Sequence, residues 1–487
     1  MPDPIKHVVL LMLENHSFDQ MMGALQKVYP DLDGIPADLP SRINFSLTGE
    51  AILQAPVGEK QMHLDPLHEV EAVAEQMASN NSGFVINFER QYKKKAEEEV
   101  PFIMGYYPLD FLPALHTLGR NFTVCDRWYS SLPGPTWPNR FFALSGTSSG
   151  HVKMPDGIRQ PDLAGFFEQD QDTIFDRLNE KNKTWTIYFY DFPCSLILTH
   201  QRRPENLAHY REIKEFFEDV KNEKDFPDFV FIEPKYFGVD QNDDHPPHNT
   251  MKTEKLIADV YNAIRSYDDL WNSTLLVIAY DEHGGFYDHV TPPPAPPPDE
   301  HHEEYTFDQF GIRVPAILVS PWVEARVEHT QFDHTSLLKY LTDKWGLGPL
   351  GQRTAAANSI AVALGDKRRD DTVGFIRVPY TDLVPEHPEW EQEESTAHQT
   401  GVHAFAYFLS KQEDPAMAAA LERVADGAGW LLKAQSVVAR FFMAVGNWLD
   451  QAVEQRRQER IRQITNVAMR VLAHGEDKAF KRGIGTD

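Results

Sequence analysis

Cysteine and long apolar runs are scarce in this chain. It has 487 residues but only two cysteines, Cys125 and Cys194, which cannot form a disulfide framework and are expected to be two buried free thiols. It has no run of eighteen apolar residues that could span a membrane. No small-residue cleavage site follows the apolar stretch at 8–13. These absences predict a soluble protein, either cytoplasmic or exported without a cleaved signal peptide.

Positive charge is also in short supply. Lys and Arg total 47 against 73 Asp and Glu, which gives a formal net charge of −26. Such a field repels nucleic acid, and it repels anionic lipid surfaces unless a local basic patch compensates. We therefore expect no nucleic-acid partner. The length, with 41% hydrophobic residues, suits one large α/β domain plus an appendage.

The first informative stretch is a six-residue apolar run at 8–13 that ends abruptly in polar residues. Such a run is typical of a strand buried on both faces of a parallel sheet. Glu14 and Asn15 follow it directly. Ligands bind at the carboxyl ends of strands in open α/β sheets, and a carboxylate beside an amide offers two oxygens to a divalent cation. The alternative is a solvated strand end with an Asn turn.

A second stretch repeats this design far along the chain. The apolar run at 274–280 is followed by Asp281, Glu282 and His283, and then by two glycines. Glycines let the backbone approach a ligand closely. Two strands that end in oxygen ligands, distant in sequence, are what a metal site across a parallel sheet requires.

Six motifs in one order carry a family resemblance. They are E-N-H-S-F-D at 14–19, G-P-T-W-P-N-R at 134–140, D-H-P-P at 244–247, D-E-H-G-G-F-Y-D-H-V at 281–290, R-V-P-A-I-L-V-S-P-W at 313–322 and F-D-H-T-S-L-L-K-Y-L at 332–341. Over roughly residues 5–350 the chain resembles the phosphoesterase family, which contains bacterial and plant non-specific phospholipases C and a group of acid phosphatases. One departure is visible, because His16 stands where the first motif usually has Arg.

The resemblance implies a fold and a nucleophile. The fold would be α/β, alkaline-phosphatase-like, with a doubly wound and mostly parallel sheet. Thr136 would be the nucleophile, close to the start of a helix predicted at 140–144. Helix N-termini favour negative charge, but threonine attacks only when a metal or base activates it. Without the family, the simpler interpretation is that Thr136 only caps the helix.

The resemblance also implies the remaining site residues. His68 and His245 would bind phosphate or protonate the leaving group, and Asn139 and His283 would contact substrate. Without the family, the two histidines would be surface or loop residues. One divalent metal ion would be held by Glu14, Asn15, Asp281, Glu282 and Thr136. Oxygen ligands favour Ca²⁺ or Mg²⁺, and Zn²⁺ stays open.

Three functions follow from these expectations. The first is a metal-dependent phosphoric-ester hydrolase of phospholipase C type that acts through a phosphothreonine on a phosphoester, including phospholipid. The second is an acid phosphatase on soluble esters, because the shared motifs do not separate the two. The third, from another class, is a non-catalytic binding protein that keeps the fold. A sulfatase is disfavoured because no C-x-P-x-R sequence occurs.

The C-terminal region differs in kind from the rest. We expect a catalytic domain at 1–395, with an irregular stretch at 351–400, and a helical appendage at 396–487. An apolar stripe recurs at three- and four-residue spacing within 438–449, and arginines cluster at 456–462. The stripe fits either a helical hairpin packed on the catalytic domain or a surface at 430–462 for a peripheral membrane or protein partner.

Overall fold

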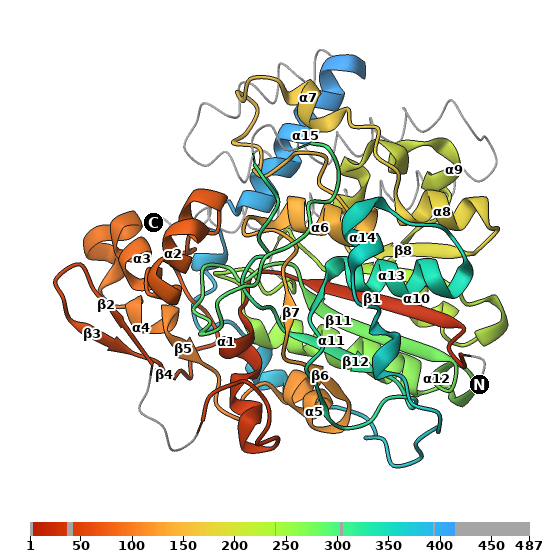
Figure 1. Ribbon diagram of the computed structural model, residues 1–487, viewed down its shortest axis with the longest axis horizontal. Helices are drawn as coiled ribbons and strands as arrows, with labels where there is room; N and C mark the ends of the chain where they lie inside the picture. Colours follow the sequence, from red (N-terminus) through yellow and green to blue (C-terminus); the bar gives the residue numbers. More distant parts are fainter. Residues whose placement is uncertain (1–2, 37–41, 239, 302–304, 393–394, 414–487) are drawn as a thin grey trace, which may run out of the picture.

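An eight-stranded sheet forms the centre of the molecule (Figure 1). The computed structural model describes residues 3–36, 42–238, 240–301, 305–392 and 395–413. From edge to edge the strands are β13 (Val327–Glu328), β6 (Thr123–Cys125), β12 (Ala316–Val319), β11 (Thr274–Tyr280), β1 (His7–Leu13), β10 (Phe229–Glu233), β8 (Trp185–Phe189) and β9 (Tyr210–Glu212). Only β12 runs antiparallel to its neighbours. The predicted α/β class with a mostly parallel sheet is confirmed.

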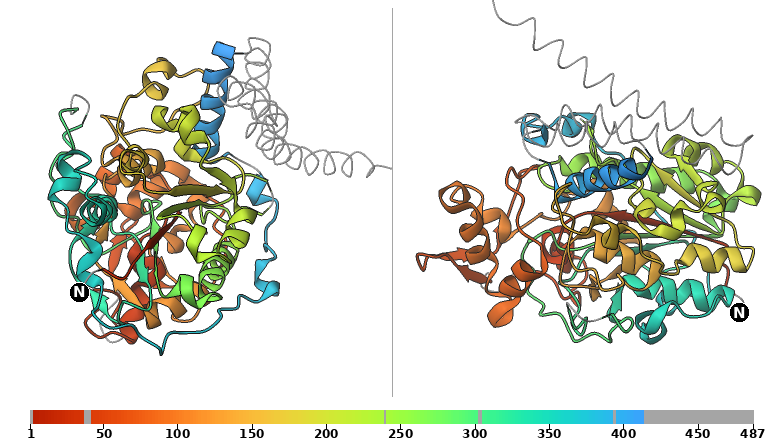
Figure 2. Two further views of the ribbon diagram at one scale, coloured as in Figure 1. Left: turned by 90° about the vertical axis from the view of Figure 1, so that its right-hand side faces the viewer. Right: turned by 90° about the horizontal axis from the view of Figure 1, so that it is seen from above.

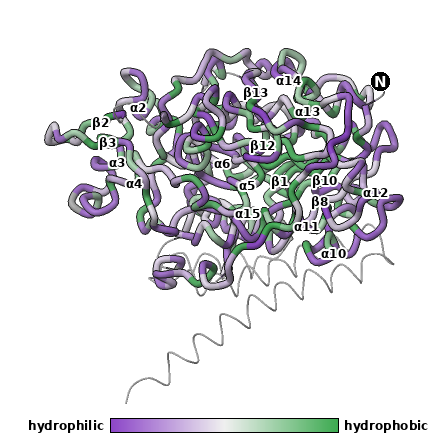
Figure 3. Tube along the Cα trace, turned by 90° about the horizontal axis from the view of Figure 1, so that it is seen from below, coloured by the Kyte–Doolittle hydropathy of each residue, from purple (hydrophilic) through white to green (hydrophobic). Residues whose placement is uncertain are grey.

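The two predicted apolar strands lie side by side in the middle of this sheet. Strands β1 and β11 pair in parallel from His7 opposite Thr274 to Leu13 opposite Tyr280. Every residue of both strands is buried, which explains why their sequences do not alternate between apolar and polar residues. The hydropathy colouring of Figure 3 shows apolar segments gathered at these central strands. Both cysteines are buried and free, as expected.

Helices cover both faces of the sheet. In Figures 1 and 2, α5, α11 and α12 lie on one side, and α6, α8 and α13 lie on the other. Helix α5 packs on β12 and α11 on β11, while α6 packs against α8 and α13. The bounds are α5 (Pro113–Asn121), α6 (Thr136–Ser145), α8 (Ile174–Glu180), α11 (Thr250–Arg265), α12 (Asp268–Trp271) and α13 (His334–Trp345). Helix α10 (Ile213–Asp219) contacts β8 and β9.

A smaller subdomain lies beyond the carboxyl end of β1, at the left of Figure 1. It has its own apolar core, which includes Phe84, Val85 and Phe88. Its elements are β2 (Ile43–Phe45), β3 (Ala51–Leu53), β4 (Ala55–Pro56), β5 (Gly105–Tyr106), α2 (Val70–Asn81), α3 (Phe84–Tyr92) and α4 (Val100–Ile103). It therefore adjoins the sheet edge at which the sequence predicts the site.

Several elements depart from the sequence expectations. Helix α6 begins at Thr136, not at residue 140. The stretch 351–400, expected to be irregular, contains α14 (Gly351–Ala356) and the start of α15 (Ala397–Glu413). The predicted stripe at 438–449, the arginines at 456–462 and the proposed partner surface at 430–462 lie outside the described residues. Within the described part of the chain, no helix is both long enough and apolar enough to cross a membrane.

The remaining described elements are short. They are α1 (Phe18–Met22), α7 (Leu163–Phe167), α9 (Pro204–Leu207) and the two paired strands β7 (Trp128–Tyr129) and β14 (Phe332–Asp333). Helix α1 directly follows the first motif and begins with a Ser17 cap, whose side chain accepts a hydrogen bond from the Gln20 amide.

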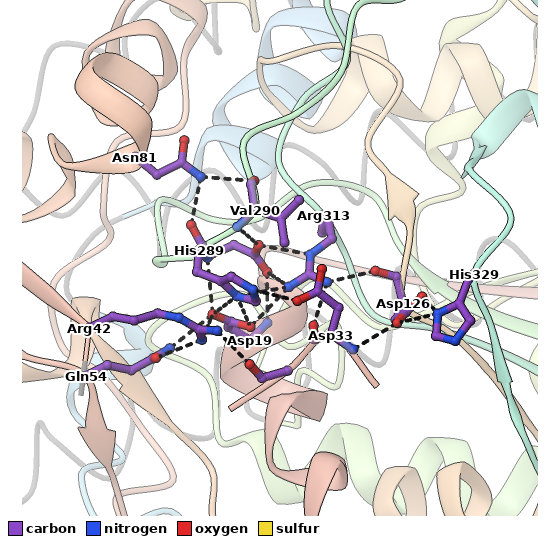
Figure 4. Close-up of polar contacts among 12 residues, drawn as sticks. Asp19, Asp33, Arg42, Gln54, Asn81, Asp126, His289, Val290, Arg313 and His329 are labelled. Carbon is purple, nitrogen blue, oxygen red and sulfur yellow. Dashed lines mark hydrogen bonds and ion pairs between the residues drawn. The ribbon is translucent and has the colours of Figure 1, made fainter. Parts of the chain in front are cut away.

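A buried ion-pair network joins α1 to the loop after β11 (Figure 4). The Arg313 guanidinium, fully buried, donates to Asp288 Oδ1 at 2.9 Å and to Asp19 Oδ1 at 3.1 Å. His289 Nδ1 lies 2.9 Å from Asp19 Oδ2. Arg42 reaches the same carboxylate at 3.2 Å. Two cationic guanidinium groups thus neutralise the two buried carboxylates.

The network also reaches into neighbouring loops. Arg313 Nη1 donates to the carbonyls of Asp33 and Asp126, both at 2.8 Å. Burial lowers the pKa of His289, but the Asp19 carboxylate outweighs this effect and raises it to about 9. The motifs that contain Asp19, Asp288 and Arg313 are therefore tied together by one set of charges.

Replacing Arg313 by Met should destabilise the fold by about 3–5 kcal/mol, because two buried carboxylates lose their main partner. The measurement is the free energy of unfolding in urea. The matched control is Arg368→Met, since Arg368 is half-exposed and pairs with Asp370 on the surface, and it should cost about 1 kcal/mol or less. Equal losses in the two variants would contradict a structural role for the buried network.

Candidate active site

The ends of β1 and β11 stay in register beyond the last paired residues. Asp281 N donates to Leu13 O at 3.0 Å, and His16 N donates to Glu282 O at 3.1 Å. Gly284 has a φ of +63°, and a Cβ built on it would stand 2.1 Å from Asn15 O, so only glycine fits there. Backbone geometry therefore brings Glu14, Asn15, Asp281 and Glu282 together, as the sequence predicted.

Arg140 lies between two of these carboxylates. Its Nε donates to Asp281 Oδ2 at 2.8 Å and its Nη2 lies 3.3 Å from Glu14 Oε1. All three side chains are buried. Burial raises the pKa of Glu14 well above its usual range, although Arg140 opposes the shift. Burial likewise raises the pKa of Asp281 to about 7, against the effect of Arg140 and with that of Glu282. The positive charge of one guanidinium does not balance the negative charge of the three carboxylates of Glu14, Asp281 and Glu282.

Thr136 is the first residue of α6. Arg140 follows it by one turn on the same helix face, and Arg140 contacts Glu14 and Asp281. The N-cap residue is Pro135, and no side chain caps this helix. The hydroxyl of Thr136 is buried and has no hydrogen-bond partner. The interpretation of Thr136 as a mere helix cap is therefore wrong.

Unpartnered oxygens are concentrated among the predicted metal ligands. Both Glu14 carboxylate oxygens, Asn15 Oδ1, Thr136 Oγ1 and Glu282 Oε1 are buried without a hydrogen bond. Leaving such atoms unpaired costs about 1–3 kcal/mol each. The donor set of carboxylates, an amide oxygen and a hydroxyl is suited to a hard divalent cation. These residues fit a metal ion.

The two predicted histidines face the same place from different segments. His68 Nδ1 lies 2.9 Å from Pro66 O, and its Nε2 is 3.5 Å from Asn15 Nδ2 and 4.0 Å from Glu282 Oε1. His245 Nδ1 lies 2.5 Å from Pro246 O. The two rings meet edge to face at 5.9 Å. In both, a backbone carbonyl orients Nδ1 and leaves Nε2 for other partners.

The charges of these histidines differ. Burial lowers the pKa of His68, but Glu282 and Asp65 raise it more, to about 9. Burial lowers the pKa of His245, only partly opposed by Asp65. Burial raises the pKa of Glu282, but His68, His283 and the Gly284 amide together lower it below its usual value. The pKa values of the two imidazoles are thus shifted in opposite directions.

Two further predicted residues serve the protein's own structure. Asn139 Oδ1 accepts from Leu132 N at 3.0 Å, and its Nδ2 donates to Gly134 O at 2.9 Å. That amide shapes the loop before Thr136. His283 Nε2 lies 2.8 Å from Gln76 Oε1, and its Nδ1 is 3.5 Å from Glu282 Oε2. Both side chains support reacting residues through contacts with their neighbours.

Sequence reasoning missed several residues of this site. Asp243 accepts the Glu14 amide through its carbonyl at 2.8 Å and contacts His248 Nδ1 at 2.5 Å. Asp244 accepts from Tyr280 OH at 2.6 Å, and its carbonyl lies 3.0 Å from His16 Nε2. Both acids are buried, although the composition of their loop is typical of a solvent-exposed segment. Asp244 belongs to the D-H-P-P motif at 244–247, and Asp243 is marked only by its place beside that motif.

Two other clusters of acids and histidine lie within the described residues. Asp19, Asp288 and His289 form one, and Asp172, Asp176 and His200 form the other. Arginines already neutralise the first, as described above. In the second, His200 bonds Asp170 at 2.6 Å and Asp176 at 3.0 Å near the surface. Glu14, Asp281 and Glu282 are not among these clusters of acids and histidine. The Arg140 guanidinium lies between the carboxylates of Glu14 and Asp281.

Comparisons with known proteins find relatives that carry the name phospholipase C. Non-specific phospholipase C3 of Arabidopsis thaliana is 32% identical over 419 residues, which are 76% of this chain and 78% of the relative. Non-specific phospholipase C6 of the same plant is 34% identical over 420 residues, covering 79% and 75%. Phospholipase C B of Mycobacterium tuberculosis is 26% identical over 436 residues, covering 79% of each chain.

Solved structures give weaker likenesses. A phosphonate monoester hydrolase of Agrobacterium radiobacter is 10% identical with a TM-score of 0.35, over 76% of this chain and 79% of that chain. A protein in the alkaline phosphatase superfamily from Vibrio parahaemolyticus is 12% identical with a TM-score of 0.29, over 67% and 74%.

The sequence model of the Phosphoesterase family matches residues 5–348, the range that contains the two strand ends, Thr136 and both site histidines. Together with the relatives, this match confirms the expected enzyme class. The chain belongs to the phosphoesterase family and is a phosphoric-ester hydrolase.

Proposed function

We propose that this enzyme is a metal-dependent phospholipase C that acts through a phosphothreonine. The observation that carries the proposal is the buried, unpartnered hydroxyl of Thr136 at the start of α6. It shares the site with the unpartnered oxygens of Glu14, Asn15 and Glu282. A hydroxyl in that position has no structural partner, and the positive end of the helix favours the charge it develops on losing its proton.

The first step forms a bond from Thr136 Oγ1 to phosphorus. The P–O bond to the leaving group breaks, the Thr136 hydroxyl proton passes to solvent, and the leaving oxygen takes a proton from His68. Water then attacks the phosphothreonine, which restores the hydroxyl. A diester releases a phosphorylated head group, whereas a monoester releases phosphate.

The other side chains prepare this reaction. His68 presents Nε2 to the phosphoryl oxygens because its Nδ1 atom is oriented by the Pro66 carbonyl, and His245 lies beside it with Nδ1 held by the Pro246 carbonyl. Arg140 holds Asp281 and Glu14 in place, and Asn139 fixes the loop that delivers Thr136. A divalent cation bound by Glu14, Asn15, Asp281, Glu282 and Thr136 would supply the positive charge that stabilises a deprotonated oxygen and the phosphoryl group.

The substrate class rests on the relatives. The plant and mycobacterial proteins reported above carry the name phospholipase C, and the chain covers about three quarters of their length. The arrangement of Thr136, His68 and His245 is equally suited to a phosphomonoester. We therefore assign a phospholipid diester as substrate and keep the phosphomonoester as the competing case.

The substrate assignment predicts faster hydrolysis of phosphatidylcholine vesicles than of p-nitrophenyl phosphate. The assay compares release of phosphocholine with release of p-nitrophenol at equal substrate concentrations. Rapid release of p-nitrophenol with no attack on phosphatidylcholine, or on other phospholipid head groups, would identify a phosphomonoesterase instead.

Thr136→Ala should lower turnover by about 10³-fold or more, because the nucleophile is lost, while Thr136→Ser should keep part of the activity. Mass spectrometry of acid-quenched wild type should find phosphate on Thr136. The matched control is Thr253→Ala, since Thr253 is also buried in a helix with an unpartnered hydroxyl and should retain activity. A fully active Thr136→Ala enzyme rules out the covalent step.

Glu14→Gln should lose bound metal and activity together, because a carboxylate ligand becomes a neutral amide. Metal content is measured by mass spectrometry of the purified protein, and activity is measured before and after adding divalent cations. The control is Glu254→Gln, a buried carboxyl in α11 that accepts amide hydrogen bonds from Ala114 and Leu115. Full activity of wild type stripped of metal would falsify the metal requirement.

A further inference from the structure

His398 reaches the site from outside the family match. That match ends at residue 348, and His398 is the second residue of α15. Its side chain is 1% exposed. Its Nδ1 lies 3.4 Å from Glu14 Oε1, a residue of the candidate metal site. A segment that the family motifs do not include therefore brings an imidazole to the reacting groups.

Neighbouring side chains fix the ring of this histidine. Trp137, the residue after Thr136, donates its indole N–H to His398 Nδ1 at 3.2 Å. The Tyr236 ring stacks on the imidazole with a centroid distance of 3.9 Å and an angle of 22°. Gln399 donates to Tyr236 O at 2.7 Å. Trp137 and Tyr236 thus set the orientation of the ring.

The approach of the helix depends on one small residue. Gly401 faces Trp137 so closely that a Cβ there would stand 2.6 Å from Trp137 Cη2. A larger residue would push α15 away from the indole. The sequence therefore lets this helix pack directly on the start of α6, next to Thr136.

These contacts determine which nitrogen carries the proton. Because Nδ1 accepts from Trp137, the neutral ring carries its hydrogen on Nε2. Nε2 is buried and has no hydrogen-bond partner. A buried N–H donor without an acceptor points to a group supplied from outside the chain.

The place of the ring indicates what that group is. Nε2 is separated by one ring carbon from Nδ1, which lies 3.4 Å from Glu14 Oε1. The lone pair of Nδ1 is used by Trp137, which leaves no free lone pair for a cation. An N–H donor at the edge of a phosphoester site is suited to an anionic phosphoryl oxygen.

We infer that His398 is a substrate-binding residue whose Nε2–H donates a hydrogen bond to a nonbridging oxygen of the phosphoryl group. The inference rests on the proposed function, since it requires a phosphoester at Thr136. It assigns to α15 a direct part in recognition, in addition to its packing on the core.

Two amide substitutions separate the two ring nitrogens. His398→Gln places its amide near the position of Nε2 and can still donate to phosphate. His398→Asn places its amide near Nδ1, so it keeps the contact with Trp137 but cannot reach the phosphate. The matched control is His403→Asn, because His403 is a buried histidine of the same helix that contacts Phe237.

The test is the dissociation constant of inorganic phosphate for the full-length, metal-loaded enzyme, measured by isothermal titration calorimetry with metal content determined in parallel. We expect about 10- to 100-fold weaker binding in His398→Asn, the range for a hydrogen bond to a charged group. His398→Gln and His403→Asn should bind as wild type does, and metal content should be unchanged. If His398→Asn does not fold, His398→Leu replaces it.

Other results would overturn the inference. If His398→Asn binds phosphate as tightly as wild type does, Nε2 is not the donor. A folded His398→Gln that loses phosphate affinity would also contradict the inference. Loss of metal in step with loss of phosphate would show that His398 acts on the cation site through Glu14. If wild type itself neither binds phosphate nor hydrolyses esters, the proposed function fails as well. That outcome differs from one in which wild type is active and the His398 substitutions have no effect.

Discussion

The placement of the Arg140 guanidinium between Glu14 and Asp281 is the interaction on which the site depends. Three carboxylates converge where β1 and β11 end, and without a cation their mutual repulsion in a buried setting would force them apart or keep them protonated. Arg140 supplies permanent positive charge from the helix that begins with Thr136. The same residue therefore holds the acidic cluster together and lies one helical turn from Thr136, the proposed nucleophile.

Much of this arrangement could be predicted from the sequence. Unbroken apolar runs predict strands that are buried on both faces. The polar residues that follow these strands lie close together because parallel strands have their carboxyl ends on the same side of the sheet. Glu14, Asn15, Asp281 and Glu282 were found this way. Thr136, His68 and His245 lie outside such patterns, and only the resemblance to the phosphoesterase family singled them out.

The rest could not be read from local pattern. Asp243 and Asp244 sit in a segment whose composition is that of a solvated loop, and their burial results from tertiary packing against Tyr280 and His248. His398 belongs to a stretch expected to be irregular, and no pattern in the neighbouring sequence indicates that its side chain contacts Glu14. Helix α6 starts earlier than predicted because Pro138 falls in its first turn, where a missing backbone N–H costs no helical hydrogen bond.

The in-register pairing of β1 with β11 limits how the enzyme can vary. Leu13 and Tyr280 are the last partners, so the next residue of each strand enters the site. Because side chains alternate between faces, one residue gained or lost in either strand would turn the ligands toward the opposite face of the sheet. The number of residues in these two strands is therefore constrained by the site at their ends.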